Sequence, residues 1–243
     1  MRDWQGKRYW LIGASEGLGK ALAHLMSRAG VELVLSARSE DSLKDLAAQL
    51  PGKADVVPVD VADLNALKAA REAAGEIDGM VFLAGVYWPM AAQEMDVEQA
   101  EIMVDVNFTG AVRSVGVVLP EMVARDAGHI VITGSLSGFR GLPGAVGYSA
   151  SKAGVMGLAE SLYCDLRRTG VSVQIINPGF IKTRLTDKNS FSMPFIMSPE
   201  AAAQEMWDFM QTTRFKKSFP RAFSYLFRLS QLMPDWLYFR LFS

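Results

Sequence analysis

Short runs of apolar residues recur along the chain and alternate with longer segments that have helical patterning. The runs are continuously apolar and rich in β-branched residues, which is typical of strands buried on both faces of a parallel sheet. The six predicted strands cover residues 8–12, 32–36, 55–59, 78–83, 129–133 and 171–176. The predicted helices between them cover residues 18–28, 42–50, 64–74, 97–125 and 146–169.

This alternation predicts an α/β fold, with one doubly wound parallel sheet flanked by helices and joined by right-handed crossovers. We expect residues 1–243 to form a single domain, since no linker, repeat or low-complexity tract interrupts the pattern. Residues 185–213 are expected to form a substrate lid and the helix after it, and residues 219–243 an amphipathic C-terminal tail. Ligands of such sheets bind beyond the carboxyl ends of the strands, where the strand order reverses.

Composition removes several classes of function. Half of the residues are apolar, which is enough for a large core, and the net charge of −1 offers no electrostatic reason to expect nucleic acid. The single cysteine excludes an intramolecular disulfide, and the two histidines form no ligand-spaced cluster, so we expect no metal site. No apolar run reaches the roughly 18 residues of a membrane-spanning helix. Because the N-terminus shows no signal-peptide pattern, we expect a cytoplasmic location.

A glycine-rich loop follows the first predicted strand and opens directly into the first predicted helix. Glycines there allow a tight turn and let the backbone approach a pyrophosphate, which the N–H groups at the start of the helix then bind. We therefore assign Gly13, Ser15, Gly17, Leu18 and Gly19 to the binding of a dinucleotide.

The end of the second strand distinguishes between the two nicotinamide cofactors. A cofactor without a 2′-phosphate is usually met there by an acidic residue that binds the ribose, whereas this chain has Arg38. A guanidinium suits the 2′-phosphate of NADP(H), although Glu16 in the glycine loop would partly offset its charge. NADP(H) is therefore favoured over NAD(H).

Tyr148 and Lys152 lie four residues apart in a predicted helix, and Ser135 lies 13 residues before Tyr148, at the end of an apolar run. Positions i and i+4 share a helix face, so the Lys152 ammonium can lie beneath the tyrosine ring and stabilise its phenolate. A phenol with a pKa near 10 needs roughly 4 kcal/mol of such stabilisation to act as an acid-base catalyst near pH 7. Together with Ser135, these residues can hold a carbonyl group and protonate its oxygen.

The order and spacing of these residues resemble those of the classical short-chain dehydrogenase/reductase family, over about residues 7–183. The matching features are the G-x-x-x-G-x-G loop, the Y-x-x-x-K pair, the serine 13 residues earlier and the Pro178-Gly179 turn. The resemblance implies a Rossmann-type domain that transfers hydride between a nicotinamide cofactor and a carbonyl or CH–OH group. In that family pattern, Tyr148 is the general acid/base and also contacts the cofactor, and Lys152 holds the nicotinamide ribose.

The resemblance also implies roles that spacing alone does not show. Asp60 and Val61 are implied to meet the adenine, and Ala84 and Gly85 to line a ribose of the cofactor. Asn107 is similar to an asparagine that helps to hold a water in a proton relay from the lysine to solvent. The residues implied to bind the nicotinamide carboxamide are Pro178, Gly179, Ile181 and Thr183.

The chain departs from the family pattern in three places. Phe82 and Leu83 replace a common Asn-Asn pair, so we expect packing to take over from side-chain hydrogen bonds that brace the sheet. Ile12 stands where a threonine often precedes the first glycine. The C-terminal region lacks the usual closing strand, and residues 216–220 lead instead into a tail rich in Phe, Leu, Tyr and Trp.

Apolar and aromatic residues dominate the segments expected to line the substrate site, which favours a small apolar or aromatic carbonyl compound or alcohol. Plain packing is the alternative for each of them. The candidates are Tyr87, Trp88, Phe139, Leu142, Phe180, Phe191, Met193, Phe195 and Met197. Lys182, Arg184 and Lys188 in the same region are interpreted as solvated surface charges, and contact with the cofactor or with a substrate carboxylate is the alternative.

The tail places Phe223, Leu226 and Phe227 on one helical face, and Pro234 starts a second short amphipathic piece. We expect this face to pack on the domain or across the interface of a homodimer or homotetramer. Peripheral contact with a membrane surface is the alternative, because arginines flank the aromatic clusters.

The leading hypothesis is an NADP(H)-dependent carbonyl reductase or alcohol dehydrogenase. The alternatives are a catalytically idle NADP(H)-binding sensor or interaction protein, and an extended-type epimerase or dehydratase that acts on nucleotide sugars. The complete set of Asn107, Ser135, Tyr148 and Lys152 argues against the sensor. The glycine spacing and the short C-terminal region argue against the epimerase.

Overall fold

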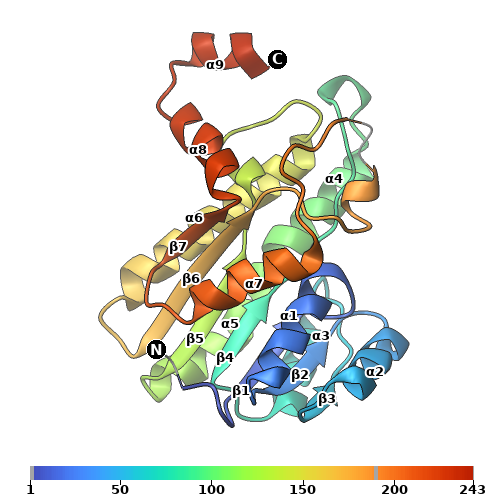
Figure 1. Ribbon diagram of the computed structural model, residues 1–243, viewed down its shortest axis with the longest axis vertical. Helices are drawn as coiled ribbons and strands as arrows, with labels where there is room; N and C mark the ends of the chain where they lie inside the picture. The colour runs from blue at the N-terminus through green and yellow to red at the C-terminus, as the bar shows by residue number, and fades with distance from the viewer. Residues whose placement is uncertain (1–2, 189–190, 243) are drawn as a thin grey trace.

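The computed structural model describes residues 3–188 and 191–242. In these residues, seven parallel strands form one sheet in the order β3-β2-β1-β4-β5-β6-β7 (Figure 1). The strands are β1 (Arg8–Ile12), β2 (Glu32–Ser36), β3 (Ala54–Val56), β4 (Gly79–Phe82), β5 (Gly128–Thr133), β6 (Val171–Pro178) and β7 (Lys216–Phe219). The predicted doubly wound parallel sheet is confirmed.

Helices cover both faces of the sheet (Figure 1). They are α1 (Gly17–Arg28), α2 (Glu40–Gln49), α3 (Leu64–Ala74), α4 (Val97–Val104), α5 (Gly110–Ala124), α6 (Val146–Leu166), α7 (Pro199–Met210), α8 (Arg221–Ser230) and α9 (Asp235–Phe242). Trp10 and Ile12 of β1 lie in the core shared with α3, α5 and α6, whereas Tyr9 and Leu11 lie in the core shared with α1, α2 and α7. Successive strand residues point to opposite faces, so a strand covered on both sides is apolar throughout.

Polar side chains cap the first turns of α2 and α3. Ser39 accepts a hydrogen bond from the Ser42 N–H, so α2 starts at Glu40, two residues before its predicted start. The Asp63 carboxylate caps α3 in the same way, and this helix starts at Leu64 as predicted. Such side chains satisfy N–H groups that have no partner inside the helix.

The helix predicted over residues 97–125 is interrupted. Between α4 and α5 lies a π-helical turn, η2 (Asp105–Thr109), which widens the helix by about one residue and changes which side chains face the core. Asn107 in this turn is fully buried. Residues 97–124 are long and apolar enough to cross a membrane by length and composition alone, but Val115, Val118 and Met122 of this stretch belong to the core beneath the sheet.

The expectation that the chain lacks a closing strand is wrong. Residues 216–219 form β7, which pairs in parallel with β6 at the edge of the sheet. Lys216 forms an ion pair of 2.5 Å with Glu160, Lys217 pairs with Glu205, and Phe219 is buried. An edge strand of this kind carries lysines that protect it from further pairing, and it therefore escapes a search for continuous apolar runs.

The tail forms the two expected amphipathic helices, α8 and α9, at one end of the molecule (Figure 1). Phe227 is buried and Phe223 is half-buried, as predicted for a packing face. Leu226 does not share that face, because it is 43% exposed. Serines complete the buried side of α8 instead, since Ser224 and Ser230 bond to carbonyls of their own helix and need no solvent.

Candidate active site

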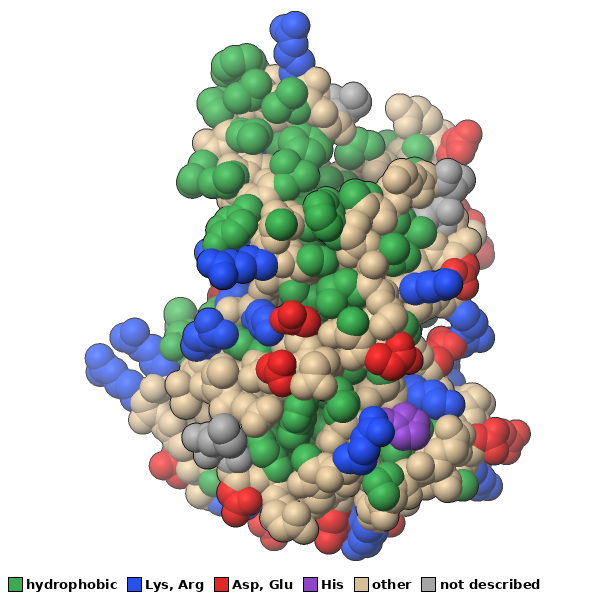
Figure 2. Space-filling model, in the orientation of Figure 1, with side chains coloured by type: hydrophobic (Ala, Val, Ile, Leu, Met, Phe, Trp, Pro, Cys, Tyr) green, Lys and Arg blue, Asp and Glu red, His purple; other side chains and the backbone are tan. Residues whose placement is uncertain are grey.

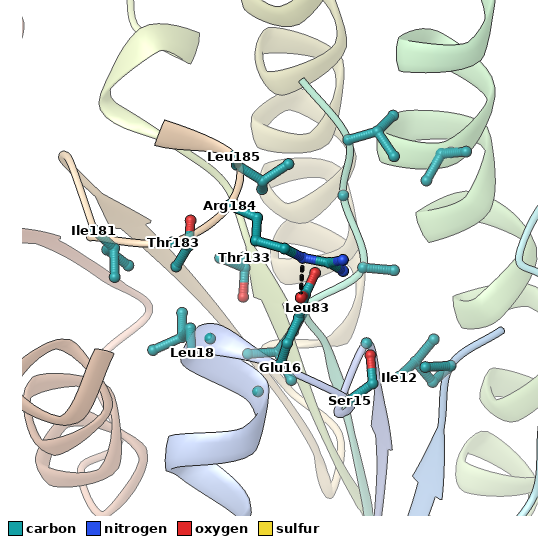
Figure 3. A pocket seen from close by; sticks show the side chains of 18 of the residues that line it. Ile12, Ser15, Glu16, Leu18, Leu83, Thr133, Ile181, Thr183, Arg184 and Leu185 are labelled. Carbon is teal, nitrogen blue, oxygen red and sulfur yellow. Dashed lines mark ion pairs between the residues drawn. The ribbon is translucent and has the colours of Figure 1, made fainter. Parts of the chain in front are cut away.

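A cleft of about 320 Å³ opens at the carboxyl ends of β1 and β4, where the strand order reverses (Figure 3). Every residue predicted to bind the cofactor lines this cleft. These residues are Gly13, Ser15, Gly17, Leu18, Gly19, Arg38, Asp60, Val61, Ala84, Gly85, Tyr148, Lys152, Pro178, Gly179, Ile181 and Thr183. The fold thus collects side chains from segments that are up to 170 residues apart into one site.

The glycine loop packs too closely for side chains. A Cβ atom on Gly13 would overlap the backbone of Ala84, and one on Gly19 would overlap the Gly13 carbonyl. Gly17 has a φ of +52°, which strains other residues, and it starts α1. Among the described residues, no side chain caps that helix, so its first N–H groups face the cleft with the positive end of the helix dipole. This cradle fits the pyrophosphate of a dinucleotide.

Two charged side chains meet across the mouth of the cleft. Glu16, from the glycine loop, forms an ion pair with Arg184, from the segment after β6 (Figure 3). The interpretation of Arg184 as a solvated surface charge is therefore incomplete, since it has a specific partner. Arg38 lies exposed after β2 and lines the same cleft. Because the Glu16 carboxylate is paired with Arg184, it offsets the positive charge of Arg38 less than expected.

Ser135, Tyr148 and Lys152 come together at the base of the cleft. Ser135 ends the loop after β5, and its hydroxyl accepts a hydrogen bond of 3.1 Å from the Ser137 N–H and bonds to Tyr148. The Lys152 ammonium lies 5.8 Å from the centre of the Tyr148 ring and donates a 3.0 Å hydrogen bond to the Thr133 carbonyl. The predicted juxtaposition of the three side chains is therefore present.

The protonation states differ from the expectation. Burial raises the pKa of Tyr148 to about 12, and its hydrogen bond with Ser135 opposes this only in part. Burial also lowers the pKa of Lys152 to about 8. As the pH rises, Lys152 therefore loses its charge before Tyr148 ionises. The expected lowering of the Tyr148 pKa by a charged lysine is absent here. At neutral pH, Tyr148 keeps its proton and Lys152 is charged.

Asn107 holds the loop that follows β4. Its amide oxygen accepts a 2.7 Å hydrogen bond from the Val86 N–H, and its amide nitrogen donates to the Val86 carbonyl at 3.0 Å and to Ser151 at 3.1 Å. The Asn107 side chain therefore bonds to both backbone polar groups of Val86, as a neighbouring strand would do in a sheet. The next residue, Tyr87, packs edge-on against Tyr148 with ring centres 4.9 Å apart. The relay role implied for Asn107 remains a prediction.

Aromatic rings gather beside the cleft, on the segment after β6. Phe180 contacts Phe191 and Phe223, and Phe195 also contacts Phe223, with ring centres 5.7 to 5.9 Å apart. Trp88 lies 4.3 Å from the Lys188 ammonium. Phe139 and Met197 pack against the two cores, in agreement with the packing alternative. Residues 189 and 190 of the predicted lid lie outside the described residues.

The sequence analysis gave several residues near the site no role there, and Thr133 and Phe223 are two of them. Thr133 lines the cleft, and its position at the carboxyl end of β5 is the signal that points to it. Phe223 comes from α8 and lies against Gly179, so a tail helix contributes to the surroundings of the site. The sequence pattern of α8 alone carries no signal for this contact, because it indicates only that Phe223 is covered.

Packing replaces the Asn-Asn pair, as expected. Phe82 is fully buried in the core beneath α3, α5 and α6, and Leu83 packs against the opposite core. The backbone still turns into the cleft at Ala84, which lies against Gly13. The turn into the cleft therefore forms with Phe82 and Leu83 in these positions.

Comparison with known proteins agrees with this geometry. The sequence pattern of the family described as short chain dehydrogenase matches residues 7–192. A relative from Myxococcus xanthus, named as an uncharacterized oxidoreductase, is 38% identical over 236 residues, which cover 94% of this chain and 93% of the relative. Another relative, an uncharacterized oxidoreductase from Staphylococcus saprophyticus, is 33% identical over 212 residues, which cover 84% of this chain and 91% of the relative.

Solved structures share the fold. A short-chain dehydrogenase from Streptomyces avermitilis superimposes with a TM-score of 0.85 at 24% identity, covering 94% of this chain and 93% of its own. An actinorhodin polyketide ketoreductase crystallised with NADPH has a TM-score of 0.81 at 26% identity, covering 90% and 97% of the two chains. The chain is therefore an oxidoreductase of the short-chain dehydrogenase family.

Proposed function

We propose that this protein is an NADP(H)-dependent oxidoreductase that interconverts a carbonyl compound and its alcohol. The observation that carries the proposal is the convergence of Ser135 and Tyr148 in the wall of the cleft, with the Lys152 ammonium one helical turn from Tyr148. Two hydroxyl groups that converge in this way can both bond to one carbonyl oxygen.

In the reductive direction, Ser135 would donate a hydrogen bond to the carbonyl oxygen and stabilise the negative charge that develops there. Tyr148 would transfer its proton to that oxygen, which completes the alcohol. Bound NADPH would supply the hydride. A phenol whose pKa is about 12 is fully protonated at neutral pH, so it is ready to act as the acid.

Lys152 would serve as the positive charge beside the phenolate that Tyr148 becomes. Below a pH of about 8 the ammonium is protonated, and its bond to the Thr133 carbonyl fixes its position. The phenolate would then regain a proton from solvent. Asn107 is proposed as a positioning residue, because it holds the loop that places Tyr87 against Tyr148.

Arg38 supports NADP(H) as the cofactor. It lies on the cleft after β2, and Glu16, the acid that would oppose a 2′-phosphate, is paired with Arg184. The NADPH complex of the similar polyketide ketoreductase is consistent with this choice. We expect Arg38→Ala to weaken NADPH binding at least tenfold and to leave NADH binding within twofold, measured by quenching of tryptophan fluorescence. Equal losses for both cofactors would contradict a contact with the 2′-phosphate.

Apolar substrates are proposed because aromatic rings dominate the segment beside the cleft. The assay is a panel of apolar and aromatic ketones, aldehydes and alcohols with NADPH and NADP⁺, followed by absorbance at the nicotinamide band.

The decisive variant is Tyr148→Phe, which removes one oxygen atom. We expect turnover to fall by two to four orders of magnitude, the usual contribution of a general acid, while NADPH binding persists. The matched control is Tyr163→Phe, since Tyr163 stacks on Phe215 away from the cleft. Near-normal turnover of Tyr148→Phe would exclude the assigned role. NADPH binding with no turnover of any panel compound by the wild-type chain would favour the sensor.

A further inference from the structure

The last two helices carry a run of large, exposed apolar side chains, which we call the tail face. It consists of Tyr225, Leu226, Leu229, Leu232, Trp236, Phe239 and Leu241, with exposed fractions between 43% and 82%. Figure 2 shows hydrophobic side chains gathered over α8 and α9, with Lys and Arg side chains at the borders of the group. Soluble surfaces rarely expose so many large apolar residues together, so a partner is expected.

The opposite side of the tail is fixed to the domain. Arg140, in the loop after Ser135, donates hydrogen bonds to the Ser230 and Met233 carbonyls at 2.5 and 2.9 Å and forms an ion pair with Asp235. Its guanidinium also lies 4.0 Å from the centre of the Tyr238 ring. These contacts hold α8 and α9 in one orientation, and the tail face is directed away from the core.

The tail is also basic, in contrast to the rest of the chain. The tail, residues 219–243, contains three basic residues, Arg221, Arg228 and Arg240, and one acidic residue, Asp235, whereas the whole chain has a net charge of −1. Asp235 is already paired with Arg140. Arg221 and Arg228 lie seven residues apart on one side of α8, and both approach Tyr225 of the tail face. Positive charge therefore borders the apolar residues directly.

We propose that the tail face docks on an anionic membrane surface. Leucines would enter the boundary between headgroups and acyl chains, Trp236 would lie at headgroup level, and Arg221, Arg228 and Arg240 would meet lipid phosphates. A second copy of the chain fits this surface less well. A two-fold contact through the same face would bring the arginines of both copies together, with no free acidic residue in the tail to neutralise them.

The test is sedimentation of the full-length protein with two kinds of vesicle, phosphatidylcholine alone and phosphatidylcholine mixed with phosphatidylglycerol. We expect the wild-type chain to bind the anionic vesicles and to leave them as salt is added. The charge variant Arg221→Gln/Arg228→Gln should bind about 30-fold more weakly, from about 1 kcal/mol per arginine. Its matched control is Arg167→Gln/Arg168→Gln, which changes two exposed arginines after α6.

A second variant, Leu229→Ser/Leu232→Ser, removes apolar surface without changing charge, and we expect at least tenfold weaker binding. Val97→Ser/Ile102→Ser on α4 is its control, since both residues are exposed outside the tail. Circular dichroism verifies the fold of each variant. Light scattering measures oligomer size, which distinguishes a contact between copies.

Three results would overturn the proposal. The first is wild-type sedimentation that is equal with and without anionic lipid. The second is a loss of binding in the control variants as large as in the tail variants. The third is a change of oligomer size in a tail variant together with no binding of the wild-type chain to vesicles. That result would assign the tail face to a contact with a second copy of the chain.

Discussion

Replacing Asn107 by alanine tests how the fold holds the active-site loop. The change deletes three hydrogen bonds, two to the Val86 backbone and one to Ser151. Each such bond contributes about 1 kcal/mol net, so the free energy of unfolding should fall by about 3 kcal/mol. Val86 is half-buried, so water can reach its backbone in part and the loss should not greatly exceed this value. For a domain of this size, the expected decrease in Tm is roughly 6 to 12 °C.

Urea unfolding followed by circular dichroism measures this loss. Asn65→Ala is the matched control, because Asn65 is exposed on α3, and its effect should stay within about 0.5 kcal/mol. Turnover should also fall in Asn107→Ala, since Val86 leads to Tyr87 and the ring against Tyr148.

A loss of less than about 1 kcal/mol in a folded Asn107→Ala protein would refute the reasoning, because solvent would then replace all three bonds at little cost. If the free energy of unfolding fell by the expected amount while turnover stayed unchanged, the effect of Asn107 on stability would be separate from any effect on catalysis. The loop would depend on Asn107, but the position of Tyr87 would not matter to Tyr148.

Two further predictions concern the cleft. Gly13→Ala should abolish NADPH binding or prevent folding, because the added methyl group overlaps the Ala84 backbone, and a soluble variant with normal NADPH affinity would contradict this packing. The stability of the protein should also depend on Lys152 above pH 8. Its pKa is about 8 when folded and 10.5 ordinarily, so the unfolded chain binds more protons between these values and stability rises with pH there, by roughly 3 kcal/mol. Lys152→Met should remove that rise in urea unfolding measured from pH 7 to 10.5, and an unchanged slope would show that Lys152 is not buried as described.

Most of the fold could be predicted from local patterns. Strands covered on both faces are apolar throughout, which locates β1 and β2 at their observed bounds. Edge strands lack this signal, so β7 with its Lys216 and Lys217 was missed. The turn η2 was missed because a π turn inserts one residue without any break in helical composition.

The residues assigned to the cofactor could be predicted to lie together because they recur at fixed spacings, and each of them lines the cleft; their binding of a cofactor stays a prediction. The protonation states could not be predicted. Sequence spacing places Lys152 beside Tyr148, but it does not reveal how far each side chain is removed from water. That burial reverses the expected direction of the Tyr148 pKa.

By itself, the sequence determined the sheet, the glycine loop and the Ser135, Tyr148 and Lys152 set, because these depend on periodicity and on short-range spacing. Only the tertiary structure decided which partners distant segments meet. Asn107 forms hydrogen bonds with Val86, Glu16 forms an ion pair with Arg184, and Arg140 donates hydrogen bonds to the tail. Hydrogen bonds and ion pairs depend on distances of a few ångströms, which arise only when the chain is folded. Folding likewise decided that the tail turns its leucines outward, because one side of α8 was already covered by the domain.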